Sequence, residues 1–207
     1  MTENARRIAE ALRPLPERSC LLVSLSKGGA DLRLALERNP ELATRAQLWI
    51  QIGGLVRGTP VVNELTRGAW WKRGLLRGYL ALTAAAPDLV TEMTRAPGTL
   101  LAAPMRVPEG LPIVNVVGFP LAGELRGRVR DRHARFACLG PNDGMGVLAD
   151  AIIDPAPVVP VRGADHYFRT PEVVPVVASI LRWWLARGRF EQHREARSLS
   201  CLVSTTN

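Results

Sequence analysis

Residues 21–37, LLVSLSKGGADLRLALE, join an apolar run to helix-forming sequence through Ser-Lys-Gly-Gly, with almost no linker. The run CLLVSL, residues 20–25, is apolar, partly β-branched and too short for a buried helix, so it predicts a buried strand. The following ADLRLALER, residues 30–38, is helical in composition and stops before Asn39-Pro40. The tight turn between strand and helix has room for one exposed residue at its tip, and that residue is Ser26.

The rest of the chain predicts an α/β protein. An amphipathic helix is expected over 3–13, and a final helix with Thr170 as N-cap, Pro171 at its first position and Gly188 as its stop. Three more strands are expected, at 47–55, 111–119 and 156–165. Strands that alternate with helices indicate a mostly parallel sheet flanked by helices. The prolines of the last strand favour an edge position or a short run.

The composition fits one globular domain. The chain has 207 residues, 47% of them hydrophobic, and a mean hydropathy of +0.04. No apolar run reaches the ~18 residues that a membrane span requires. The N-terminal sequence is charged and amphipathic and has no apolar signal core, so we expect a cytoplasmic location.

Basic residues dominate the charge. The formal net charge is +8, and only Lys27 and Lys72 among the 27 basic residues are lysine, a pattern more typical of codon bias than of a binding adaptation. No nucleic-acid-binding module is recognisable, so we expect no specific nucleic-acid partner. The segment 124–136, ELRGRVRDRHARF, would place its arginines on one face if it were extended.

Cysteine spacing gives no sign of a metal site or a disulfide framework. The three cysteines, Cys20, Cys138 and Cys201, are scattered and odd in number, which favours small core residues or exposed thiols. The sequence also lacks the glycine patterns of phosphate-binding loops. We therefore expect no metal and no cofactor.

Three short motifs carry a resemblance. SLSKGG around Ser26, GPNDG around Asp143 and GADHYF around His166 occur in the order serine, acid, histidine. In this order they resemble the nucleophile elbow, acid turn and histidine loop of the α/β-hydrolase family, specifically its lipase-like bacterial esterases. The resemblance covers roughly residues 20–185. It implies a Ser26–His166–Asp143 triad that acts on a small-molecule ester or acyl substrate.

The steric requirements of a sharp strand–helix turn also favour Ser26 as the nucleophile. A strand that reverses sharply into a helix crowds the residues two before and two after the tip, and these are the small Ser24 and Gly28. The family usually has glycine at the first of these positions. Glycine at 28 and 29 would let the helix pack close to the strand. The helix N-terminus favours negative charge, so the amide of Lys27 could donate to an oxyanion. A glycine-rich turn that merely packs well is the alternative.

The histidine and acid each have competitors. His166 follows a strand at the carboxyl edge of the sheet, where open α/β sheets bind ligands, whereas His133 and His193 fit solvated surface. Asp143 sits in a tight turn that would fix a carboxylate, and its plain alternative is an ordinary turn aspartate. Adjacent side chains rarely aim at each other, which disfavours Asp165. Asp150 and Asp154 are expected at the surface; Glu124 is a further alternative.

The predicted organisation has three parts: 1–56 with 111–188 as hydrolase core, 57–110 as a helical cap insertion, and 189–207 as a polar tail. The insertion lies where the family often carries a lid. Its aromatic residues, Trp70, Trp71 and Tyr79, could face an acyl pocket, although packing into the core explains any single tryptophan as well.

Few residues precede the elbow strand, whereas the family has several strands before it, so the resemblance implies a partial α/β-hydrolase fold. The family's second oxyanion donor comes from that missing part. We therefore expect either a second copy or another chain to supply strands, or a catalytically impaired binding or scaffold protein. An arginine-rich binder of nucleic acid or membrane surfaces is a third hypothesis.

Overall fold

The computed structural model describes residues 1–67, 92–103 and 105–187. The chain divides into two compact units, Met1–Phe168 and Arg169–Asn207. The first unit contains the whole described sheet and all three predicted triad residues, so it is the unit that positions the site. The predicted cap residues Trp70, Trp71 and Tyr79 lie outside the described residues, as does His193, and the predicted domain boundaries stay predictions.

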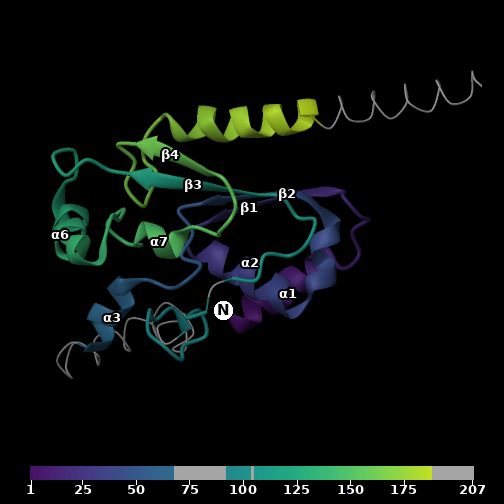
Figure 1. Ribbon diagram of the computed structural model, residues 1–207, viewed down its shortest axis with the longest axis horizontal. Coiled ribbons are helices and arrows are strands. Elements are labelled where there is room, and N and C mark those ends of the chain that lie inside the picture. Colours follow the sequence, from purple (N-terminus) through teal and green to yellow (C-terminus); the bar gives the residue numbers. More distant parts are fainter. Residues whose placement is uncertain (68–91, 104, 188–207) are drawn as a thin grey trace, which may run out of the picture. The chain divides into compact units, whose positions relative to one another are not determined.

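Four parallel strands form the sheet in the order β1-β2-β3-β4 (Figure 1). They are β1 (Cys20–Leu25), β2 (Ala46–Ile52), β3 (Ile113–Phe119) and β4 (Val158–Arg162). Each strand pairs in parallel with the next, which confirms the predicted parallel α/β sheet. Because all strands run the same way, their carboxyl ends meet at one edge, where the loops that follow them can share a site.

Helices α1 (Thr2–Leu12) and α2 (Lys27–Arg38) share a hydrophobic core with the two central strands. Leu12, Leu32 and Leu36 are buried there with Trp49 of β2 and Ile113 of β3. Removing such side chains from water supplies about 1.5–3 kcal/mol each. The core therefore holds α2, and with it the turn before α2, against the sheet.

The remaining described elements are short. They are the 3-10 helices η1 (Pro40–Arg45) and η2 (Ala137–Leu139) and the helices α3 (Pro60–Arg67), α6 (Gly127–Phe136) and α7 (Leu148–Ala151). In the second unit residues 173–187 are helical, so this helix begins two residues after the predicted Pro171. Within the described residues, no helix combines the length and apolarity that a membrane span needs.

The condition for a one-faced arginine stripe over residues 124–136 is not met, because most of this segment is helix α6 and not extended (Figure 1). Arginine is a good helix former, and nothing in the segment provides the β-branched run that favours a strand. A two-residue alternation distributes the arginines around a helix instead of gathering them on one face. Phe136 is the one residue of α6 that is buried.

The two edges of the sheet differ. The edge position predicted for the fourth strand is confirmed, and Pro160 in β4 removes one backbone donor there. The elbow strand β1 forms the other edge of the described sheet. The prediction that this strand is buried is wrong, because an edge position leaves Val23 and Leu25 each 54% exposed and Ser24 is its one buried residue. Pairing of β1 with a strand from a second copy or another chain stays a prediction.

Candidate active site

Ser26 lies between the last residue of β1 and the first residue of α2, with φ 53° and ψ −121°. A positive φ is strained for any residue with a side chain, so the surrounding contacts must hold it. The Ser26 N–H donates to the carbonyl of Ile52 at 3.0 Å, and the Ser26 carbonyl accepts from Leu55 at 3.1 Å and from Gly29 at 3.0 Å. These bonds fix a strained serine at the tip of the strand–helix turn.

Small residues surround this turn, but they are needed to different degrees. A Cβ on Gly29 would lie 3.2 Å from the Cα of Gly54, so α2 passes close to the backbone that follows β2. A Cβ on Gly28 would lie 3.9 Å from the Cβ of Ser24, an ordinary contact. The need for glycine therefore falls on position 29, and the crowding expected between positions 24 and 28 is mild.

Ser24 has a partner that the sequence did not reveal. Its Oγ accepts a hydrogen bond of 2.8 Å from the indole Nε1 of Trp49, which is fully buried on β2. A buried indole N–H needs an acceptor, and a glycine at position 24 would supply none. Serine at this position is thus explained by the tryptophan on the neighbouring strand.

His166 follows β4 and is almost fully buried, at 4% exposure. Its Nε2 lies 2.7 Å from the Oγ of Ser26. The loop that carries it is fixed by Phe168, whose ring occupies the space beside Gly53: a Cβ on Gly53 would lie 2.5 Å from the Cε2 of Phe168. The backbone of Gly53 has φ +49°, so both space and conformation require glycine there.

The carboxylate of Asp143 completes the chain of hydrogen bonds. Its Oδ2 lies 2.8 Å from the Nδ1 of His166, and its Oδ1 accepts from the amides of Met145 at 2.9 Å and Gly146 at 2.7 Å. The backbones are also joined, because the His166 N–H donates to the Asp143 carbonyl at 3.0 Å. Asp143 is buried, with the whole residue 3% exposed. Both carboxylate oxygens therefore have hydrogen-bond partners, and Oδ2 is directed at the His166 imidazole.

The other acids lie elsewhere. Asp165 caps its own loop, accepting from the amide of Tyr167 at 2.9 Å, and Glu124 is exposed. The expected surface position of Asp150 is wrong: it is 5% exposed and forms ion pairs with Arg95 and Arg57. Burial is possible because the arginines compensate its charge, a contact between distant segments that no local pattern could show.

The arrangement can move a proton. A carboxylate only accepts hydrogen bonds, so Nδ1 of His166 carries a proton and donates a hydrogen bond to Asp143. The Nε2 is then free to accept from the hydroxyl of Ser26, and a histidine in this state can serve as a general base. At the other end of β1, burial raises the pKa of the Cys20 thiol, which makes that thiol a weak nucleophile.

Lys27, the first residue of α2, has an amide that the helix itself leaves unbonded. Its ammonium group is held one turn along the helix by Asp31, which also accepts from Asn4 of α1 at 2.9 Å. The four-residue spacing of Lys27 and Asp31 is a sequence signal for this pair.

Among the described residues, no group of metal-binding side chains comes together.

Solved structures share this architecture. The structure of a metagenomic carboxyl esterase is similar to this chain, with 27% sequence identity and a TM-score of 0.63. The match covers 78% of this chain and 49% of the esterase chain. The chain has an α/β-hydrolase fold. The mature form of a Bacillus licheniformis lipase supports the same fold, with 18% sequence identity and a TM-score of 0.57. That match covers 86% of this chain and 73% of the lipase chain. The chain spans about half the length of that esterase. No protein-family model and no curated protein sequence matches it.

Proposed function

We propose that this α/β-hydrolase is a serine hydrolase that cleaves carboxylic esters, with Ser26 as nucleophile, His166 as general base and acid, and Asp143 as the residue that orients the imidazole. The observation that carries the proposal is the continuous hydrogen-bond chain from Ser26 Oγ through His166 to Asp143 Oδ2, with distances of 2.7 Å and 2.8 Å. The likeness to a carboxyl esterase at 27% identity supports the choice of an ester substrate.

In the proposed acylation step, Ser26 Oγ attacks the ester carbonyl carbon while Nε2 of His166 takes the hydroxyl proton. The carbonyl oxygen becomes an oxyanion, which the amide of Lys27 and the N-terminus of α2 stabilise. When the tetrahedral intermediate collapses, His166 gives the proton to the departing alcohol oxygen. The acyl group then remains on Ser26.

Deacylation repeats these roles with water. His166 takes a proton from a water molecule as that water attacks the acyl carbon, and it then returns the proton to Ser26 Oγ as the acid product leaves. Asp143 stays ionised throughout and stabilises the imidazolium form of His166. The saturated surroundings of Asp143 support this role, because its Oδ1 is already held by two amides.

A fluorophosphonate probe tests the proposal, because such a probe forms a stable bond with an activated serine. We expect labelling of the full chain at Ser26, found by mass spectrometry of the digested protein. Ser24→Ala is the matched control, since Ser24 lies two residues away and is buried against Trp49. Absence of labelling in a folded chain would favour the catalytically impaired binding or scaffold protein.

A further inference from the structure

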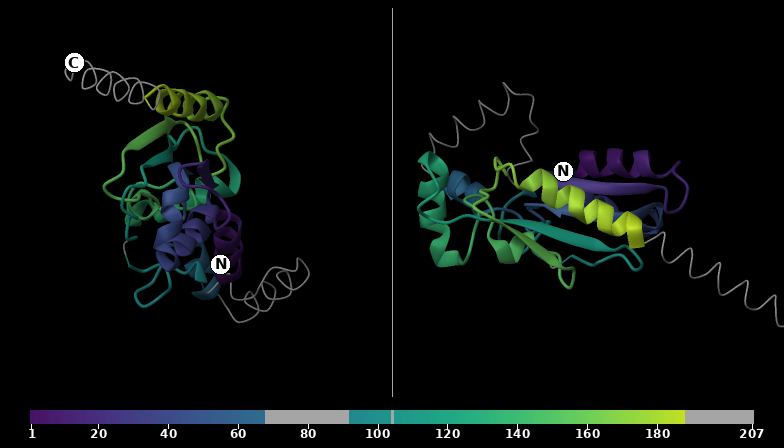
Figure 2. Two further views of the ribbon diagram at one scale, coloured as in Figure 1. Left: turned by 90° about the vertical axis from the view of Figure 1, so that its right-hand side faces the viewer. Right: turned by 90° about the horizontal axis from the view of Figure 1, so that it is seen from above.

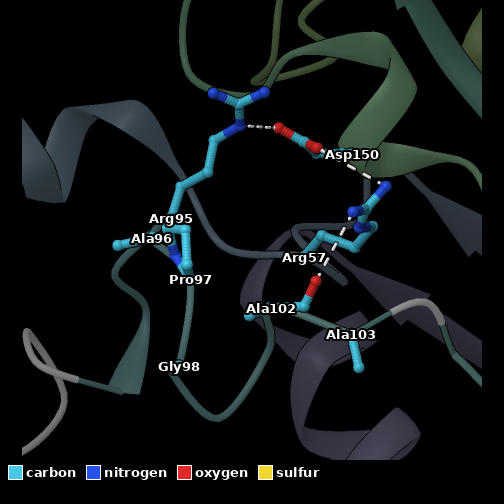
Figure 3. Close-up of a pocket in the computed structure, with 8 residues that line it drawn as sticks. All are labelled: Arg57, Arg95, Ala96, Pro97, Gly98, Ala102, Ala103 and Asp150. Carbon is cyan, nitrogen blue, oxygen red and sulfur yellow. Dashed lines mark hydrogen bonds and ion pairs between the residues drawn. The ribbon is translucent and has the colours of Figure 1, made fainter.

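A cavity of about 550 Å³ is lined by none of the three candidate triad residues. Its walls combine three charged side chains with small, mostly apolar residues (Figure 3). The lining residues are Arg57, Arg95, Ala96, Pro97, Gly98, Ala102, Ala103 and Asp150. Volumes of 300–1,000 Å³ are typical of pockets that take small molecules.

The two arginines share one carboxylate. Figure 3 shows Asp150 between the guanidinium groups, with ion pairs to both. Arg95 Nε donates directly to Asp150 Oδ2. Arg57 Nη1 lies 3.9 Å from Asp150 Oδ1, which is too far for a hydrogen bond. Arg95 therefore neutralises Asp150, and the positive charge of Arg57 is left to face the pocket.

Arg57 also has open donors. Its Nε is buried and has no hydrogen-bond partner among the described residues. Its Nη2 reaches one carbonyl, that of Ala102, at 3.4 Å. A guanidinium group presents five N–H donors, so most of the hydrogen-bonding capacity of Arg57 is unused.

The neighbouring Arg33 shows that this part of the fold can saturate a guanidinium group. Its Nε donates to Glu37 at 3.0 Å, and its two terminal nitrogens donate to the carbonyls of Val56 at 2.6 Å and Ala103 at 2.8 Å. Both arginines thus contact the same 101–103 segment, but Arg33 is satisfied by protein atoms and Arg57 is not. The open donors of Arg57 are therefore a local property of the pocket.

We propose that this pocket binds an organic anion, whose carboxylate or phosphate group pairs with Arg57 and whose small apolar body packs against Ala96, Pro97 and Ala103. A guanidinium group matches the geometry of either oxyanion with two parallel hydrogen bonds. The anion would fill the open donors and balance the pocket's single excess positive charge. The alanines and proline of the wall offer no polar side chain to the body of the ligand, which favours an apolar body.

Titration calorimetry on the full chain at fixed ionic strength tests this proposal. The probes are benzoate and phenyl phosphate, which share an apolar ring and differ in the anionic group, with benzamide as the neutral counterpart and inorganic phosphate as the ringless one. Arg57→Gln removes the charge, and Arg128→Gln is the matched control on the exposed face of α6. Ala96→Glu keeps both arginines and adds a carboxylate to the wall, so it carries the test if Arg57→Gln does not fold.

We expect at least one of the two aromatic anions to bind, with equal affinity for the unmodified chain and Arg128→Gln. Its binding should weaken about tenfold or more in Arg57→Gln and in Ala96→Glu, as loss of a charged hydrogen bond implies. Which anion binds decides between carboxylate and phosphate. No binding of either, equal binding of benzamide, or unchanged affinity in either pocket variant would overturn the proposal. If inorganic phosphate bound as tightly as phenyl phosphate, the proposal that the ligand has an apolar body would be wrong.

Discussion

The candidate triad and the arginine pocket are both polar clusters, but they differ in how many hydrogen-bond partners their charged groups have within the protein. Around Ser26, each oxygen of Asp143 and both ring nitrogens of His166 have partners within the protein. In the pocket, Arg57 keeps a buried donor with no described partner. Saturated groups are held in one geometry, as a proton relay needs, whereas open donors are suited to a ligand. The number of unused hydrogen-bond donors thus distinguishes a site whose side chains are fixed in place from a pocket that can bind a ligand.

Asp143→Asn should give the largest effect. Asparagine keeps the shape but cannot hold the same imidazole tautomer, so ester turnover should fall by up to ~10⁴ while the fold persists. Turnover of a nitrophenyl ester, measured beside a circular dichroism spectrum, checks this. Glu124→Gln is the matched control, because Glu124 is an exposed carboxylate outside the hydrogen-bond chain. Turnover that survives in Asp143→Asn and disappears in Glu124→Gln would move the acid to Glu124.

The turn around Ser26 could be predicted from the sequence because its parts are local. A short apolar run, a serine, two glycines and a helix predict a turn around Ser26. Asp143 and His166 were expected beside it because their motifs resemble the acid turn and histidine loop of the α/β-hydrolase family. The environment of Asp150 could not be predicted. Its partners Arg57 and Arg95 come from segments far away in the chain, and only the folded structure brings them together.

The same distinction applies to the buried partners of the elbow. The bond between Ser24 and Trp49 depends on the register of β1 against β2, which pattern alone does not give. The conformation of residues 124–136 was ambiguous for a different reason, since an alternation of arginines is compatible with a strand as well as with a helix. Packing of Phe136 into the core accompanies the helix.

A pair of arginine variants sharpens the comparison through stability. Arg33→Gln should lower the free energy of unfolding by about 3–5 kcal/mol, because it removes a buried cation from Glu37 and several carbonyls. Arg57→Gln should cost about 1 kcal/mol or less, because its one ion pair is 3.9 Å long and the Arg57 side chain is 36% exposed. Urea unfolding curves measure both. Equal losses would show that Arg57 is as firmly bound within the protein as Arg33.

Ser24→Ala should lower the free energy of unfolding by about 1–3 kcal/mol. The substitution leaves the buried indole N–H of Trp49 without its acceptor. The intrinsic fluorescence of the chain during chemical unfolding follows the change. Unaltered stability would mean that the indole finds another acceptor, and that position 24 needs only a small side chain.

Two glycine substitutions should give the smallest effects, with opposite signs. Gly28→Ala should raise stability by about 0.5–1 kcal/mol, since alanine favours the helix and a Cβ fits there. Gly29→Ala should lower it by about 1 kcal/mol or more, because its Cβ would press on Gly54. Thermal unfolding of the two variants decides this. A gain in both would show that α2 can shift away from the sheet without cost.

Site-resolved labelling with a fluorophosphonate tests most directly whether Ser26 is an activated nucleophile. The unmodified chain, Ser26→Ala, His166→Ala and His133→Ala are compared by mass spectrometry after equal exposure to the probe. We expect one adduct at Ser26, present in the unmodified chain and in His133→Ala and absent from the other two variants. An adduct that persists in folded Ser26→Ala, or that forms on Ser26 equally well in His166→Ala, would contradict the proposed serine–histidine pair.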